Sequence, residues 1–244
     1  MEIRTRSSFL MDVLRDVAAG KLVPASFQRP YVWRGPDVEA FWTSITKEWP
    51  IGSILIWEPD ASVDVSRVGR TRLGPIEPAG EPKGIILDGQ NRLATFAWSL
   101  RMPGDPMPDL SLLSEAEREV WGSKQLFVFD THERRARFAH EDEVMGEHLI
   151  VPAGIVHDST KLWPFISKRE KQIDISDEAI TWLDHFGKAV RSAQCTTTIL
   201  DRASPADALD AFRHIARVGV PMSEQDFADA MAWALEDAPA APSL

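Results

Sequence analysis

The sequence predicts an α+β fold, with a mixed α/β core over residues 1–150 and a mainly helical extension of the same domain over residues 151–244. Three observations predict it. In the first part, short apolar runs ended by Gly or Pro alternate with apolar residues at helical spacing. After Ser176 the apolar residues recur mainly at helical spacing. We find no internal repeat and no linker that would divide the chain into two domains.

Helices and short strands alternate in the first part. Apolar residues at helical spacing predict helices over 8–19, 37–49 and 91–100, and Gly20 is a natural stop for the first. Apolar runs predict strands over 53–57, 84–87 and 125–130, the last pairing with 136–139 as a hairpin. Two prolines exclude a helix over 22–33, which is expected to be an edge strand or a loop leading from one.

The remaining elements follow the same logic. Seven Gly and Pro residues predict that residues 58–83 are mostly loop, with one short strand near Val63. In the second part an apolar stripe predicts a helix over 180–190, and a Thr- and Ile-rich run predicts a last strand over 195–200. Two further helices are expected over 205–217 and 223–235, with Ser223 as the N-cap of the second.

Composition narrows the function classes. The chain has 244 residues and a formal net charge of −10, which opposes unaided binding to duplex DNA because such binding depends on phosphate neutralisation by Lys and Arg. Cys195 is the single cysteine, so no disulfide can form within the chain, as suits a reducing compartment. We recognise neither a signal peptide nor an apolar run long enough to span a bilayer. The expected location is the cytoplasm.

The most informative local feature is Asp88-Gly89-Gln90-Asn91-Arg92, which ends an apolar strand and begins a helix. Free backbone N–H groups and the helix dipole favour an anion at such a point. Gly89 permits a tight turn and close approach of a ligand. Arg92 offers a planar fork of donors to a phosphate, Asp88 can hold Mg²⁺ or orient a water, and the two amides supply neutral donors and acceptors. The residues suit a polyphosphate site.

A structural interpretation of this turn remains open beside the functional one. Asp or Asn could simply cap the helix, with Arg92 in a surface salt bridge, since such caps are common. The glycine spacing matches neither a Walker loop nor a Rossmann fingerprint. The same choice arises for Gln28, Arg29, Tyr31 and Trp33. Gln28 and Arg29 are expected to face the turn and an aromatic ring to stack on a base, whereas the alternative makes Tyr31 and Trp33 core anchors.

Three segments together carry a family resemblance. They are Phe27-Gln28-Arg29-Pro30-Tyr31-Val32-Trp33, Pro50-Ile51-Gly52-Ser53-Ile54 and Ile86-Leu87-Asp88-Gly89-Gln90-Asn91-Arg92-Leu93. In order and spacing the chain resembles the DUF262 family, the N-terminal domain of GmrSD-type modification-dependent restriction systems. Asn91 stands where that family has a second Gln, and Ala216 stands where it has Asn in a turn between two late helices.

The resemblance implies a ParB/sulfiredoxin-like core in which an Arg-bearing turn at a helix start binds nucleotide phosphates. We therefore expect a nucleoside triphosphate (NTP) with Mg²⁺ as the ligand. We expect catalysis by Asp88, Gln90 and Arg92, with Asp88 as the metal ligand. Nucleotide binding is expected of seven further residues: Gln28, Arg29, Tyr31, Gly52, Ser53, Gly89 and Asn91.

The resemblance also implies partners. Family members are associated with NTP binding and hydrolysis that regulates a nuclease in phage defence, and many carry a C-terminal HNH-type nuclease domain. The six histidines of this chain form no recognisable HNH setting, so we expect no DNA cleavage by this chain alone and a separately encoded nuclease as partner. The alternative is a non-catalytic, DNA-binding or modification-sensing adaptor with a vestigial nucleotide site, which Asn91 and Ala216 favour.

Overall fold

A five-stranded mixed sheet forms the centre of the protein. The computed structural model describes residues 2–61, 63, 72–102, 104–122 and 125–218. The strand order is β1 (Glu2–Phe9), β8 (Gln194–Ala203), β3 (Ser53–Pro59), β4 (Gly84–Asp88) and β2 (Leu22–Pro24). β1 pairs antiparallel with β8, and β3 pairs antiparallel with β4. The pairs β3–β8 and β2–β4 are parallel.

Helices cover both faces of this sheet. Ile54, Ile56 and Ile86 join a large core beneath α1 (Leu10–Ala18), α2 (Gly35–Thr46), α3 (Gln90–Ser99) and α8 (Asp177–Ser192). Leu55 and Trp57 point to the opposite face, where they pack with Phe212 of α9 (Pro205–Val218). Successive residues therefore face opposite cores, as a strand buried on both sides requires.

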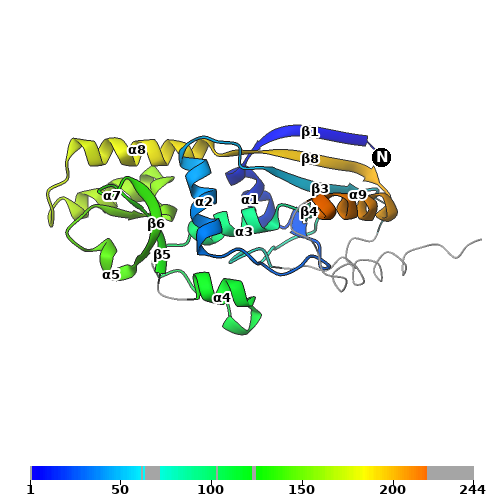
Figure 1. Ribbon diagram of the computed structural model, residues 1–244, viewed down its shortest axis with the longest axis horizontal. Coiled ribbons are helices and arrows are strands. Elements are labelled where there is room, and N and C mark those ends of the chain that lie inside the picture. Colours follow the sequence, from blue (N-terminus) through cyan, green and yellow to red (C-terminus); the bar gives the residue numbers. More distant parts are fainter. Residues whose placement is uncertain (1, 62, 64–71, 103, 123–124, 219–244) are drawn as a thin grey trace, which may run out of the picture.

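A second, three-stranded sheet lies at the other end of the molecule (Figure 1). Its order is β6 (Arg135–His140), β5 (Gln125–Asp130) and β7 (Ile150–Pro152), all antiparallel. Short helices surround it: α5 (Glu141–Val144), α6 (Ala153–Val156) and α7 (Ser159–Arg169). The 3₁₀ turn η2 (Leu110–Leu112) and α4 (Glu115–Trp121) project below α3 in the same view.

The α+β class and most predicted elements are confirmed. The strands predicted over 53–57, 84–87, 125–130 and 195–200 are present, and the hairpin partner predicted over 136–139 is β6. The helices predicted over 37–49, 91–100 and 180–190 are α2, α3 and α8, with slightly different ends. Cys195 is buried in β8, as expected of a small apolar side chain. Among the described helices, none has both the length and the apolar character that a membrane span needs.

Several predictions were wrong or incomplete. Residues 2–9 form β1, so the helix predicted from Ser8 begins at Leu10 instead. β1 could not be predicted because its residues are exposed on both faces and show no hydrophobic alternation. The short helices α4 and α7 were not predicted. Val63 lies in a bend, and the residues around it are outside the described part, as are the helix expected over 223–235 and its cap Ser223.

Candidate functional site

The turn between β4 and α3 is built as the sequence predicts. Asp88 ends β4, and Gly89 is the N-cap of α3 in the left-handed region, with φ of 95°. A Cβ on Gly89 would lie 2.9 Å from Ile54 Cγ1 and 3.1 Å from the Ser53 carbonyl oxygen. Only glycine therefore satisfies both the dihedral angle and the close approach of β3.

The first turn of α3 exposes unused hydrogen-bond donors. No side chain caps this helix, and its first turn has no acidic residue. The backbone N–H groups of Gln90, Asn91 and Arg92 donate to no other described residue. The structural interpretation is therefore wrong about a cap by Asp or Asn, but its salt bridge is present, because Arg92 pairs with Asp88. Arg92 in the first turn opposes the helix dipole, and both features favour an anion at this end.

Arg92 belongs to a cluster on the β3 side of α3, which we call the Arg92 cluster (Gly52, Ser53, Asp88 and Arg92). Its Nη1 donates a 2.7 Å hydrogen bond to the Ser53 carbonyl and lies 3.6 Å from Asp88 Oδ2. The Asp88 and Arg92 side chains are 42% and 28% exposed. The pair is thus partly open to solvent, and a ligand can reach both charges.

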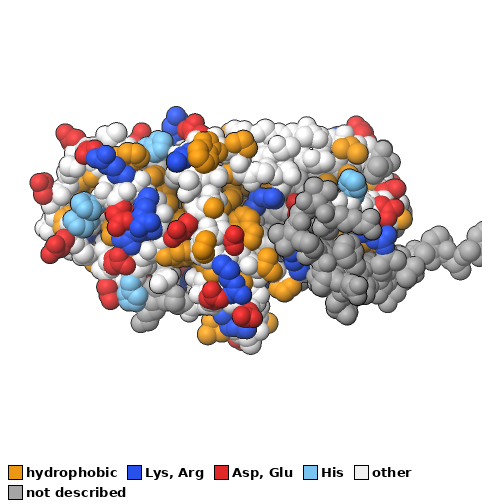
Figure 2. Space-filling model, viewed as in Figure 1, with side chains coloured by type: hydrophobic (Ala, Val, Ile, Leu, Met, Phe, Trp, Pro, Cys, Tyr) orange, Lys and Arg blue, Asp and Glu red, His pale blue; other side chains and the backbone are white. Residues whose placement is uncertain are grey.

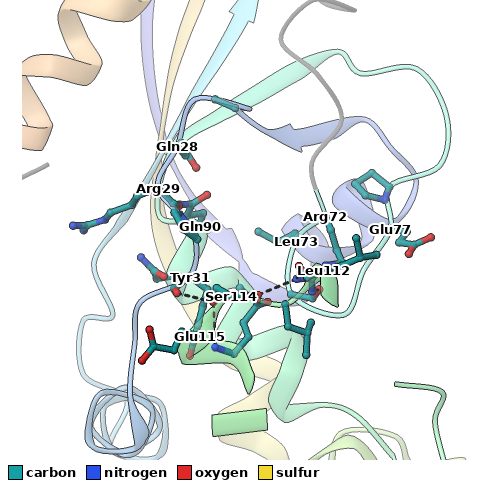
Figure 3. A pocket seen from close by; sticks show the side chains of 18 residues that line it. Gln28, Arg29, Tyr31, Arg72, Leu73, Glu77, Gln90, Leu112, Ser114 and Glu115 are labelled. Atoms are coloured by element: carbon teal, nitrogen blue, oxygen red, sulfur yellow. Dashed lines mark hydrogen bonds and ion pairs between the residues drawn. The ribbon is translucent and has the colours of Figure 1, made fainter. Parts of the chain in front are cut away.

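The other predicted residues lie around a cavity of about 740 Å³ on a different side of α3. Gln90, Asn91 and Ala94 of α3 line it, together with Gln28, Arg29 and Tyr31. Figure 3 shows Gln28, Arg29 and Gln90 on one side and Arg72, Leu73 and Glu77 on the other. Its volume is within the range of small-molecule sites. The Arg92 cluster and Gly89 are not among its lining residues.

Amide side chains fix the segment 28–32, called the strap, against α3 and β4. Gln90 Nε2 donates to the carbonyl of Arg29, and Asn91 Oδ1 accepts a 3.1 Å bond from the N–H of Val32. Gln28 Nε2 donates to the Ile86 carbonyl at 2.7 Å. One polar group of each amide is therefore already used within the protein. Gln90 Oε1 and Asn91 Nδ2 have no partner among the described residues.

Tyr31 and Arg29 differ in whether their polar groups are free to bind a ligand. The Tyr31 ring is buried, and its hydroxyl is bonded to Thr95 Oγ1 at 2.8 Å and to Trp121 Nε1 at 3.4 Å. Burial raises its pKa to about 12. This environment favours the core-anchor interpretation of Tyr31. Only the carbonyl of Arg29 is bonded, by Gln90 Nε2, and its guanidinium makes no hydrogen bond or ion pair with any described residue. In Figure 3 the side chain extends away from Arg72 and Glu77.

Sequence analysis missed the far wall of the cavity. Arg72 donates to Glu117 at 2.9 Å, and the Glu117 carboxylate also accepts from Ser114 N–H at 2.9 Å and Trp98 Nε1 at 3.1 Å. Ser114 Oγ donates to the Tyr31 carbonyl, which joins this wall to the strap. The readable signal was the capping-box spacing of Ser114 and Glu117, which begins α4.

At the turn between β4 and α3, the carboxylate available to a metal ion among the described residues is that of Asp88. No group of three or more His, Cys, Asp or Glu side chains in the described part of the chain could hold a metal. Asp88 alone fits the usual arrangement of nucleotide-bound Mg²⁺, which takes one or two carboxylates and completes its shell with phosphates and water.

Comparison with known proteins relates the chain to one family model and to an archaeal protein. The family model described as GmrSD restriction endonuclease, N-terminal domain, matches residues 10–232. An uncharacterized protein of Methanocaldococcus jannaschii is 22% identical over 247 residues, an alignment that covers 93% of this chain and 41% of that protein. The chain therefore spans less than half the length of this relative.

Proposed function

Since the chain belongs to the family of GmrSD restriction endonuclease N-terminal domains, we propose that it is the NTP-binding module of a restriction or phage-defence system. The observation that carries the proposal is the first turn of α3. Three backbone N–H groups there have no described acceptor. Arg92 lies on one side of this turn and the uncommitted Arg29 borders the cavity on the other. Free N–H groups and two guanidinium groups suit a triphosphate.

The cavity would take the nucleoside part of the ligand. Its strap side presents amides of Gln28, Gln90 and Asn91, and apolar side chains such as Leu73 and Leu113 complete it. A mostly apolar cavity with a few polar groups is typical of sites that bind flat heterocyclic ligands. The phosphates would extend from it across the first turn of α3 toward Arg92.

Asp88 would hold Mg²⁺ together with the phosphates, and the ion would neutralise charge between phosphate groups. Asp88 would then exchange its contact with Arg92, which is weak at 3.6 Å, for the metal. The released guanidinium could donate to a phosphate oxygen. Positioning and charge neutralisation account for most of phosphoryl-transfer catalysis, so these groups could also support hydrolysis.

A nucleotide is better matched to this surface than duplex DNA is. On the face in Figure 2 the Lys and Arg side chains are interspersed with Asp and Glu, and they form no continuous stripe among the residues coloured there. The net charge is −10. We therefore expect DNA contacts to require a partner, and propose a nuclease as that partner, acting in the cytoplasm.

Titration calorimetry with ATP, GTP, CTP and UTP, with and without Mg²⁺, tests the proposal. We expect binding by the native chain and a loss of about tenfold or more in affinity for Arg92→Ala and for Arg29→Ala. Arg15→Ala is the matched control, because Arg15 pairs with Asp12 on the exposed face of α1. Absence of binding by the native chain would reject the proposal.

Measuring phosphate release from the bound NTP distinguishes an NTPase from a module that binds the nucleotide without hydrolysing it. Release that depends on Arg92 would support an NTPase. Binding without release would favour the alternative, a non-catalytic sensor whose site only reports the nucleotide.

A further inference from the structure

The guanidinium of Arg92 lies directly against the backbone of Gly52. A Cβ placed on Gly52 would be 2.9 Å from Arg92 Nε, 3.0 Å from Cζ and 3.1 Å from Nη2. These three similar distances show that the face of the guanidinium lies over the position that a Cβ on residue 52 would occupy. Distances in this range are shorter than ordinary contacts of a Cβ, so Arg92 can keep this position only because residue 52 has no side chain.

Two further contacts fix the same group. Nη1 donates to the carbonyl of Ser53, the residue after Gly52, and Asp88 Oδ2 lies 3.6 Å from that nitrogen. The side chain is thus held against one short segment, the start of β3, and against the end of β4. The Nε and Nη2 groups donate to no described residue. A guanidinium has five N–H donors, so several remain for a ligand.

We infer that Gly52 is a positioning residue, which acts through Arg92 to aim a guanidinium at the phosphates of the ligand. The inference rests on the proposed function. A free arginine side chain must give up rotamer freedom when it binds a phosphate, and a side chain already held by the protein loses less. Gly52 and Ser53 therefore serve the nucleotide site without touching the nucleotide.

A simpler explanation of Gly52 is its dihedral angle alone, since its φ is 92°. Gly104 provides the matched control. Its φ is 86°, and a Cβ there would meet no atom of a described residue within 4 Å. Gly104→Ala therefore measures the cost of a side chain at this φ without a collision. Gly52→Ala measures that cost together with the displacement of Arg92.

A double-mutant cycle tests the inference. Affinities for inorganic tripolyphosphate and for the four NTPs are measured for the native chain, Gly52→Ala, Arg92→Ala, the double variant and Gly104→Ala. We expect Gly52→Ala and Arg92→Ala each to weaken binding by about tenfold, and the double variant to bind no more weakly than Arg92→Ala. Gly104→Ala should bind as the native chain does.

The inference would be overturned if the losses of affinity in the two single variants multiplied in the double variant. It would also be overturned if Gly52→Ala bound the ligands as tightly as the native chain does. Either outcome would leave the proposed function standing. A native chain that binds none of these ligands would overturn both. Urea unfolding of each variant, without ligand, shows that the protein is folded. It also tests the contact itself, because Gly52→Ala should destabilise the native chain more than it destabilises the Arg92→Ala chain.

Discussion

Arg72 and Glu117 form a shielded ion pair that joins two segments 45 residues apart, with a 2.9 Å hydrogen bond between side chains that are 15% and 5% exposed. Glu117 also accepts hydrogen bonds from the Trp98 indole and from the Ser114 N–H. One carboxylate therefore ties α3, α4 and the segment before Gly74 together along the far wall of the cavity.

Removing that carboxylate should destabilise the fold. We expect Glu117→Ala to lower the free energy of unfolding by about 3 to 5 kcal/mol, because it removes the counter-charge of a shielded guanidinium and leaves the Trp98 indole and the Ser114 N–H without an acceptor. Urea unfolding followed by tryptophan fluorescence measures the change. Glu115→Ala is the control on the same helix, since its side chain is 84% exposed. Similar stabilities for the two variants would contradict the assigned role of Glu117.

The strap should loosen when its acceptor on α3 is removed. Asn91→Ala deletes the oxygen that accepts the Val32 N–H, and a single hydrogen bond of this kind contributes about 1 kcal/mol. We expect faster hydrogen–deuterium exchange at residues 29–33 and weaker nucleotide binding, with little change in global stability. Unchanged exchange at Val32 would show that Asn91 does not hold the strap.

Arg169 should stabilise the loop between α5 and β7. The side chain is 1% exposed and donates to the carbonyls of Met145, Gly146 and His148. Arg169→Met leaves these carbonyls without their donor, so we expect a loss of about 3 kcal/mol in the free energy of unfolding. Arg169→Lys should recover only part of it, because one ammonium cannot reproduce the planar fork. Full recovery by lysine would contradict this explanation.

The protein should lose stability through His157 as the pH falls below about 6.5. Burial lowers the pKa of this half-buried histidine below its ordinary value of 6.5. The folded state therefore binds a proton less readily than the unfolded state does. The contribution of neutral His157 to the free energy of unfolding is fully present above pH 6.5. It is lost as the pH falls toward the lowered pKa of the folded state. His157→Phe should reduce the pH dependence of urea unfolding over this interval; an unchanged dependence would assign it to other groups.

Magnesium should strengthen nucleotide binding through Asp88. We expect Asp88→Asn to bind NTP in the absence of Mg²⁺ at least as well as the native chain, because a negative charge beside the phosphates is removed, and to gain little from added Mg²⁺. Asp12→Asn is the control, since Asp12 also forms an exposed pair with a nearby arginine. Equal enhancement by Mg²⁺ in all three proteins would exclude Asp88 as the ligand.

Much of the site could be predicted from the sequence because it is local. An apolar strand, a glycine and a helix with apolar spacing follow one another within 84–99, and this order alone places Asp88, Gly89 and Arg92 at a helix start. The division of the site was not predicted. Gln90 and Ala94 share one side of α3, whereas Arg92 points to β3, because successive helical residues are rotated by about 100°.

The parts of the fold and of the site that could not be predicted depend mainly on contacts between residues far apart in the sequence. Arg72 reaches the cavity from a loop and Glu117 from the first turn of α4, and neither local sequence shows that the two side chains meet there. β1 is held by its pairing with β8 and has no buried face, so hydrophobic alternation could not reveal it. α7 was missed because Pro164 lies within it, although Leu162 and Ile166 bury its apolar side.

The place of β8 in the sheet has a consequence for biosynthesis. This strand lies between β1, which is made first, and β3, yet it ends at Ala203. A nascent chain on the ribosome therefore carries β3 and β4 with one edge uncovered until nearly all of the domain has been synthesised. Completion of the large sheet must therefore wait for β8, and until then β3 exposes an unpaired edge.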